Sequence, residues 1–213
     1  VTRSLGFLRR TNVLWALALI FACAFVAIAT WFWKGSTPSR LQVAHLVMPV
    51  APGQNLPPMM GLALSPDDSK IVYVGSNGTT RRLYLRSMST MQTTAVEGTE
   101  GANYPFFSPV SEWVGFFSAR KLMKASVNGG APVTILDAPL SGSGGSWAKD
   151  GTIFFVNTYP QGIWRVPASG GVAQPVTKLN RAKGEASHQF PVVLSETRVL
   201  LYTVWTGPGL DEH

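Results

Sequence analysis

Two nine-residue segments of this chain resemble each other at a spacing of 41 residues. Residues 122–130 are Leu-Met-Lys-Ala-Ser-Val-Asn-Gly-Gly, and residues 163–171 are Ile-Trp-Arg-Val-Pro-Ala-Ser-Gly-Gly. Each segment combines a short apolar strand containing a basic residue with a turn that ends in Gly-Gly. Repeats of about 40 residues are typical of the four-stranded blades of a β-propeller. The spacing therefore predicts an all-β chain built from blades, an architecture that favours binding over catalysis.

Short apolar runs separated by turn residues continue this pattern along the chain. The turns Ser65-Pro66 and Ser108-Pro109 lie 43 residues apart, and each precedes a further apolar run. The spacing predicts four-stranded blades at about 59–98, 103–138 and 144–180, and an incomplete blade at 188–213. Propellers usually close with about four to eight blades, so three and a half blades form only a partial propeller. We expect the chain to be a fragment, or to complete the ring by self-association with another copy.

An uncharged, almost wholly apolar run occupies residues 12–33. About 20 apolar residues in a helix cross a bilayer, and the basic residues Arg3, Arg9 and Arg10 before the run favour a cytoplasmic N-terminus. We predict a basic cytoplasmic stub at 1–11, one transmembrane α-helix at 12–33 that contacts the lipid bilayer, and a linker at 34–58 that contains a first strand at 41–48. The propeller at 59–213 would then lie outside the cytoplasm, at the inner membrane. A cleaved signal peptide is the alternative, since Ala27-Ile-Ala29 resembles a cleavage site.

Composition excludes some classes of function. The net charge is +7, but the 18 basic residues are spread along the chain, which argues against a nucleic-acid partner. The single cysteine, Cys23, lies in the apolar run and excludes an intrachain disulfide. The paired residues Glu185 and His188 lack a third ligand for a metal site. We therefore predict no metal and no cofactor.

A series of short motifs follows the turn at Ser65-Pro66-Asp67-Asp68. The motifs occur in order at residues 83–86, 98–102, 105–109, 129–133, 145–147, 163–167 and 184–188. Together they resemble the TolB-type, WD-repeat-like propeller of exported bacterial proteins. Over about residues 12–206 the series resembles the extracytoplasmic C-terminal region of bacterial transmembrane serine/threonine protein kinases. In that family a cytoplasmic kinase domain precedes one membrane helix and a propeller.

The resemblance also has departures. Asp68 replaces the turn glycine of the first blade, Val110-Ser111 replaces Asp-Gly in the second, and residues 195–197 replace Pro-Asp-Gly in the fourth. None of the kinase motifs occurs: there is no Gly-rich loop with a strand lysine, no His-Arg-Asp and no Asp-Phe-Gly. The resemblance therefore implies a non-catalytic sensing or protein-interaction module, with any kinase activity outside this chain.

The candidate binding residues precede the innermost strands of successive blades. They are Asn103, Tyr104, His188 and Gln189. We expect them on the channel face, where a protein or a small envelope ligand would bind. Two alternatives stay open: a stand-alone envelope scaffold of the TolB type, and the propeller part of a prolyl-oligopeptidase-like peptidase. The aromatic residues on the strands, such as Phe117 and Trp147, are interpreted as packing between blades.

Overall fold

The chain divides into two compact units, Val1–Met48 and Pro49–His213. The computed structural model describes residues 15, 19–26, 28, 30, 54–56, 61–137, 144–157, 161–194 and 199–207. Each unit is described by itself below.

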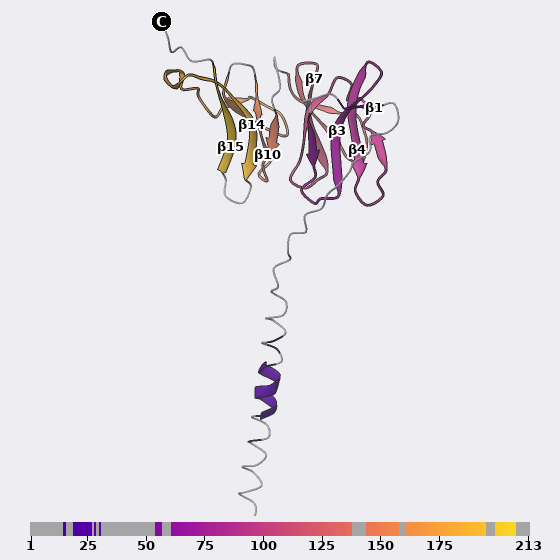
Figure 1. The fold of residues 1–213 in the computed structure, drawn as a ribbon, viewed down its shortest axis with the longest axis vertical. Helices are drawn as coiled ribbons and strands as arrows, with labels where there is room; N and C mark the ends of the chain where they lie inside the picture. Colours follow the sequence, from indigo (N-terminus) through magenta and orange to yellow (C-terminus); the bar gives the residue numbers. More distant parts are fainter. Residues whose placement is uncertain are drawn as a thin grey trace, which may run out of the picture. The chain divides into compact units, whose positions relative to one another are not determined.

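The first unit is described only within the apolar run. Trp15, residues 19–26, Ile28 and Thr30 are helical and exposed, and the helix is indigo in Figure 1. In the part of the chain that is described, no helix has both the length and the apolar character needed to cross a membrane. The rest of the predicted membrane helix at 12–33, the basic stub at 1–11 and the strand predicted at 41–48 lie outside the described residues.

The second unit is built from antiparallel strands and one short 3₁₀ turn, η1 (Arg181–Lys183), in its described part. In the first sheet β4 pairs with one edge of β3, and β1 and β2 both pair with its other edge; β5 lies beyond β4. The second sheet contains β6 to β9, the third contains β10 to β13, and the fourth contains β14 and β15 (Figure 1). The strands are β1 (Gln54–Asn55), β2 (Leu62–Leu64), β3 (Lys70–Asn77), β4 (Thr80–Ser87), β5 (Thr93–Ala95), β6 (Asn103–Phe107), β7 (Trp113–Ser118), β8 (Lys121–Ser126), β9 (Val133–Asp137), β10 (Gly145–Trp147), β11 (Thr152–Val156), β12 (Ile163–Pro167), β13 (Gln174–Pro175), β14 (Glu185–Leu194) and β15 (Val199–Thr206).

The turn after the first strand of a sheet recurs with the same backbone shape. Its last residue has a left-handed conformation, with φ of 57° at Asp68, 60° at Ser111 and 84° at Gly151. The Ser65 hydroxyl accepts the Lys70 N–H at 2.8 Å, and the Ser108 hydroxyl accepts the Trp113 N–H at 3.0 Å in the same way. The departures from glycine at Asp68 and Ser111 therefore leave the turn intact.

Consecutive sheets pack face to face through two apolar clusters. Because side chains alternate along a strand, the second sheet contributes one face to each cluster. The first cluster joins the first two sheets through Val72, Val74, Leu83, Ala102, Phe107, Val114, Phe116 and Ala125. The second joins the second and third sheets through Phe106, Phe117, Leu122, Ile135, Ile153, Phe155 and Val166. The predicted role of the strand aromatics in packing between sheets is confirmed for Phe116, Phe117 and Phe155, which are 3% exposed or less.

Candidate binding site on the inner strands

One strand from each sheet lies beside a strand of the next sheet, and we call these four strands, β2, β6, β10 and β14, the inner strands. β6 contacts both β2 and β10, and β14 contacts β10. β6, β10 and β14 are the first strands of their sheets, β2 follows β1 in the first sheet, and each of the four pairs antiparallel with the strand that follows it. Gly61, just before β2, lies near Tyr104, and Gly144, just before β10, lies near Phe190, so the starts of these strands mark one end of the row.

Two of these strands carry the same irregularity. Tyr104 in β6 and Phe190 in β14 have φ of 46° and 51°, a conformation that bulky residues rarely adopt. Each is followed by a proline, which has no N–H to give to the neighbouring strand. The strand pairing shifts at each of these points, between Asn103 and Phe106 in β6 and between Gln189 and Val192 in β14. Both strands therefore contain a β-bulge that redirects an aromatic side chain.

The bulges lie where a neighbouring glycine approaches closely. A Cβ added to Gly61 would lie 3.4 Å from the Tyr104 Cα, and a Cβ added to Gly144 would lie 3.3 Å from the Phe190 Cα. Both glycines have positive φ, at 93° and 91°. The backbone of each bulge thus packs against a glycine at the start of the preceding inner strand.

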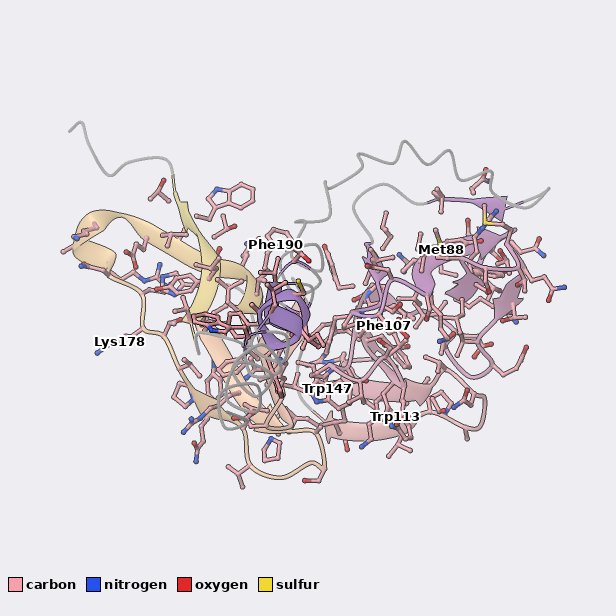
Figure 2. The ribbon with its side chains drawn as sticks, turned by 90° about the horizontal axis from the view of Figure 1, so that it is seen from below. Met88, Phe107, Trp113, Trp147, Lys178 and Phe190 are labelled. Atoms are coloured by element: carbon pink, nitrogen blue, oxygen red, sulfur yellow. The ribbon has the colours of Figure 1, made fainter. Side chains whose placement is uncertain are left out.

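The two aromatic rings meet at this end of the row. The Tyr104 and Phe190 ring centroids are 6.4 Å apart and the ring planes are tilted by 59°. Phe190 is 44% exposed, and Tyr104 and Asn103 are half-buried. Figure 2 labels the Phe190 side chain. The Asn103 side-chain carboxamide makes no hydrogen bond within the described residues. This aromatic corner, formed by Asn103, Tyr104 and Phe190, offers two ring faces and a side-chain carboxamide to an uncharged ligand.

His188 is buried instead and its side chain is fully bonded. The His188 Nδ1 lies 2.7 Å from the Thr177 hydroxyl, and Nε2 lies 3.1 Å from a Glu185 carboxylate oxygen. Its ring also packs on Tyr202, with centroids 4.6 Å apart. The Asn180 N–H donates to Glu185 at 2.6 Å, and this bond together with His188 holds the pKa of the Glu185 carboxyl below its ordinary value. The cluster joins the segment between β13 and η1 to β14 and β15, and no ring nitrogen is left for a ligand.

The structure therefore places the four predicted residues in two different environments, one accessible and one buried. Asn103 and Tyr104 lie within β6 at the aromatic corner, whereas His188, 2% exposed, and Gln189, 8% exposed, are buried in β14. Gln189 is held there by a hydrogen bond of 2.9 Å to the Ser187 hydroxyl. Within the described residues there is no cluster of three or more His, Cys, Asp or Glu side chains able to hold a metal ion.

Phe190 was not among the predicted residues. The sequence feature that could have identified Phe190 is the similarity between two segments that start at positions 103 and 189. These segments are Asn103-Tyr104-Pro105 and Gln189-Phe190-Pro191. That spacing corresponds to two blades rather than one, so a search at the one-blade period does not align the two segments.

A separate hollow of about 420 Å³ lies at the other end of the third and fourth sheets. The turn after β10, the strand β11 and the facing ends of β14 and β15 line this open hollow. Its lining residues are Ala148, Lys149, Asp150, Phe154, Val193, Val199 and Leu200.

Comparison with known proteins identifies the fold. No protein-family model and no curated protein sequence matches the chain. A putative TolB from Agrobacterium tumefaciens superposes with a TM-score of 0.56 and 19% identity over 69% of this chain and 58% of that one. TolB from Acinetobacter baumannii gives 0.54 and 17%, over 71% and 44%. Hydrazine synthase from Kuenenia stuttgartiensis gives 0.53 and 13%, over 81% and 47%.

These likenesses establish a TolB-like β-propeller fold. The chain spans about half the length of the solved chains it matches. Because an enzyme is among the similar structures, the fold by itself does not distinguish a binding module from a catalytic one.

Proposed function

We propose that this chain is a non-catalytic binding module, anchored in the inner membrane by residues 12–33 with its propeller outside the cytoplasm. The observation that carries the binding role is the aromatic corner of Asn103, Tyr104 and Phe190. Two bulky residues are held in a strained backbone conformation, and strain of this kind is concentrated at functional sites. The expected partner is a protein or a small envelope ligand without charge.

We further propose that the module is the sensing part of a receptor-like serine/threonine protein kinase. The ordered motifs between residues 83 and 188 support this context, and so do the apolar run and the arginines before it. Signalling would require a ligand that binds one arrangement of the propeller and the membrane helix more tightly than another. The TolB-like fold also supports a second candidate, a stand-alone envelope scaffold.

The coding sequence upstream of Val1 distinguishes the two candidates. An open frame that continues upstream into kinase motifs is the result expected for the receptor kinase. A stop codon and a ribosome-binding site directly before Val1 would contradict the kinase context and leave the scaffold.

The orientation is tested by cysteine labelling in intact cells, in a Cys23→Ser background. Ser169→Cys, at an exposed turn position, should react with a membrane-impermeant maleimide. Ser4→Cys, in the predicted cytoplasmic stub, is the matched control and should react only after the cells are opened. Labelling of Ser4→Cys but not Ser169→Cys in intact cells would reverse the proposed orientation.

The aromatic corner is tested by photo-crosslinking, because the ligand is unidentified. A photoreactive amino acid at position 103 should give a crosslinked adduct in intact cells. The same group in place of Asn128, an exposed turn residue, is the control. The adduct at position 103 should disappear in Phe190→Ala. An equal yield at the two positions would refute a binding site at the corner.

A further inference from the structure

A hollow of about 290 Å³ opens beside the outer strands of the third sheet. It is formed by β12, β13, the residues just before β12, and residues 177–181, which lead from β13 into η1. Its lining residues are Gln161, Gly162, Trp164, Pro175, Thr177, Lys178, Leu179 and Arg181. We call it the basic hollow, because two of these residues are cationic and none of them is acidic. It shares no residue with the aromatic corner.

The apolar part of the basic hollow comes from Trp164 and Pro175. These two residues are paired across β12 and β13, so their side chains are neighbours on one face of the sheet. Trp164 Nε1 donates a hydrogen bond to Gln161 Oε1 at 3.1 Å, which limits the rotation of the indole. An indole and a proline ring thus provide a fixed apolar surface for a flat group.

Residues 177–181 are tied to the start of β12. The Ile163 N–H donates to the Thr177 hydroxyl at 2.8 Å, and the Thr177 N–H donates to the Ile163 carbonyl at 3.2 Å. A Cβ added to Gly162 would overlap the Thr177 carbonyl oxygen, so glycine at position 162 permits this close approach. Lys178 therefore extends from a backbone that is held against β12.

The two cations of the basic hollow have no acidic counterpart. Within the described residues neither Lys178 nor Arg181 forms a salt bridge. Arg181 Nη1 donates to the Glu185 backbone carbonyl at 3.3 Å, whereas the Glu185 carboxylate is bonded to the Asn180 N–H and to His188. Two positive charges beside one hollow repel each other, and a bound anion relieves that repulsion.

We propose that the basic hollow binds a small anion that carries a flat apolar group, such as an aromatic carboxylate. A guanidinium holds a carboxylate through two parallel hydrogen bonds, and Lys178 supplies a second positive charge. Trp164 and Pro175 supply the surface against which the ring packs. The volume lies at the lower end of the range of small-molecule sites, roughly 300 Å³, and suits a single ring with one acid group.

The proposal is tested with 4-fluorobenzoate as the probe and the full chain in mild detergent. Titration of the chain should raise the ¹⁹F transverse relaxation rate of the probe above that in detergent alone. Lys178→Gln with Arg181→Gln should weaken binding by at least about tenfold, because hydrogen bonds to a charged group are lost. The matched control is Arg120→Gln with Lys121→Gln, which removes two positive charges from the hairpin of β7 and β8 and should leave binding unchanged.

Two further probes separate the charge from the ring. 4-Fluorobenzamide has the ring without the charge and fluoroacetate has the charge without the ring, so each should bind at least about tenfold more weakly than 4-fluorobenzoate. Circular dichroism should show that the variants keep their strands, and Lys178→Gln alone serves if the double variant does not fold.

Three results would each overturn the proposal: no binding of 4-fluorobenzoate, equal binding by the double variant and its control, or equal binding of the benzamide and the benzoate. The inference does not rest on the aromatic corner, so Phe190→Ala should leave 4-fluorobenzoate binding unchanged. Loss of the photo-crosslink at position 103 with this binding intact would count against the aromatic corner alone.

Discussion

Phe106 packs between two glycines, Gly115 on the paired strand β7 and Gly145 at the start of β10 in the third sheet. A Cβ added to Gly145 would overlap the Phe106 ring, with Cδ1 and Cζ each at 2.8 Å. The Gly145 backbone lies outside the left-handed region, so alanine is compatible with its φ. Gly145→Ala therefore tests the space between the second and third sheets without adding backbone strain.

The expected effect is a net loss of stability. Alanine lowers the entropy of the unfolded chain and stabilises the protein by about 0.5 kcal/mol. An extra methyl group in a filled core costs about 1–3 kcal/mol, since the ring or the strand must move. Gly145→Ala should therefore lower the free energy of unfolding by about 0.5–2.5 kcal/mol, and the Tm by roughly 1–10 °C for a domain of this size.

The assay is chemical denaturation followed by circular dichroism, with Gly207→Ala as the control. A Cβ at Gly207 would meet only the Ala186 Cβ at 3.7 Å, an ordinary contact, and Gly207 also lacks a positive φ. Phe106→Leu should relieve Gly145→Ala, so the double-mutant cycle should show a coupling of about 1 kcal/mol. If Gly145→Ala is as stable as Gly207→Ala, or if the two changes are additive, the packing of β6 on β10 is refuted.

Three further changes test the turn and the buried cluster. Asp68→Gly should raise the free energy of unfolding by about 0.5–1 kcal/mol, because φ at position 68 is 57° and glycine adopts this left-handed conformation without a Cβ clash. A lower denaturation midpoint would contradict this prediction. Thr177→Val should cost about 1–2 kcal/mol in urea denaturation, because both His188 Nδ1 and the Ile163 N–H lose the Thr177 hydroxyl as a partner. A loss below about 0.5 kcal/mol would show that these two bonds are dispensable. Because the pKa of Glu185 is lowered in the folded state, its bonds stabilise the fold above the ordinary value of 4.5 and are lost as the pH falls below it. Unfolding midpoints between pH 7 and pH 3 should therefore fall less steeply in Glu185→Gln than in the unchanged chain, and equal slopes would refute this role.

Local patterns predicted the strands well, because each depends on residues that are close in sequence. The apolar run at 71–74 lies within β3, and residues 163–166 lie within β12. Patterns were less accurate at the sheet margins. Within the third blade, predicted at 144–180, residues 172–179 also suit a strand, but β13 covers only Gln174–Pro175. β14 begins at Glu185, ahead of the His188 at which the fourth blade was placed. At these positions pairing with a neighbouring strand decides the boundary, and the local sequence carries no record of that pairing.

The sequence by itself determined the all-β class, the period of about 40 residues and the turns, since these follow from apolar runs and from residues that suit a tight turn. Only the tertiary structure decided which polar and aromatic residues are accessible. His188 and Gln189 are neighbours of Phe190 in sequence, yet they are buried and bonded while Phe190 is exposed. The reason is the bulge in β14, which reverses the alternation of side chains at Phe190. It brings the Phe190 ring to Tyr104, 86 positions earlier in the chain. Gly144, just before the inner strand β10, has no side chain and so leaves space for the Phe190 backbone and ring.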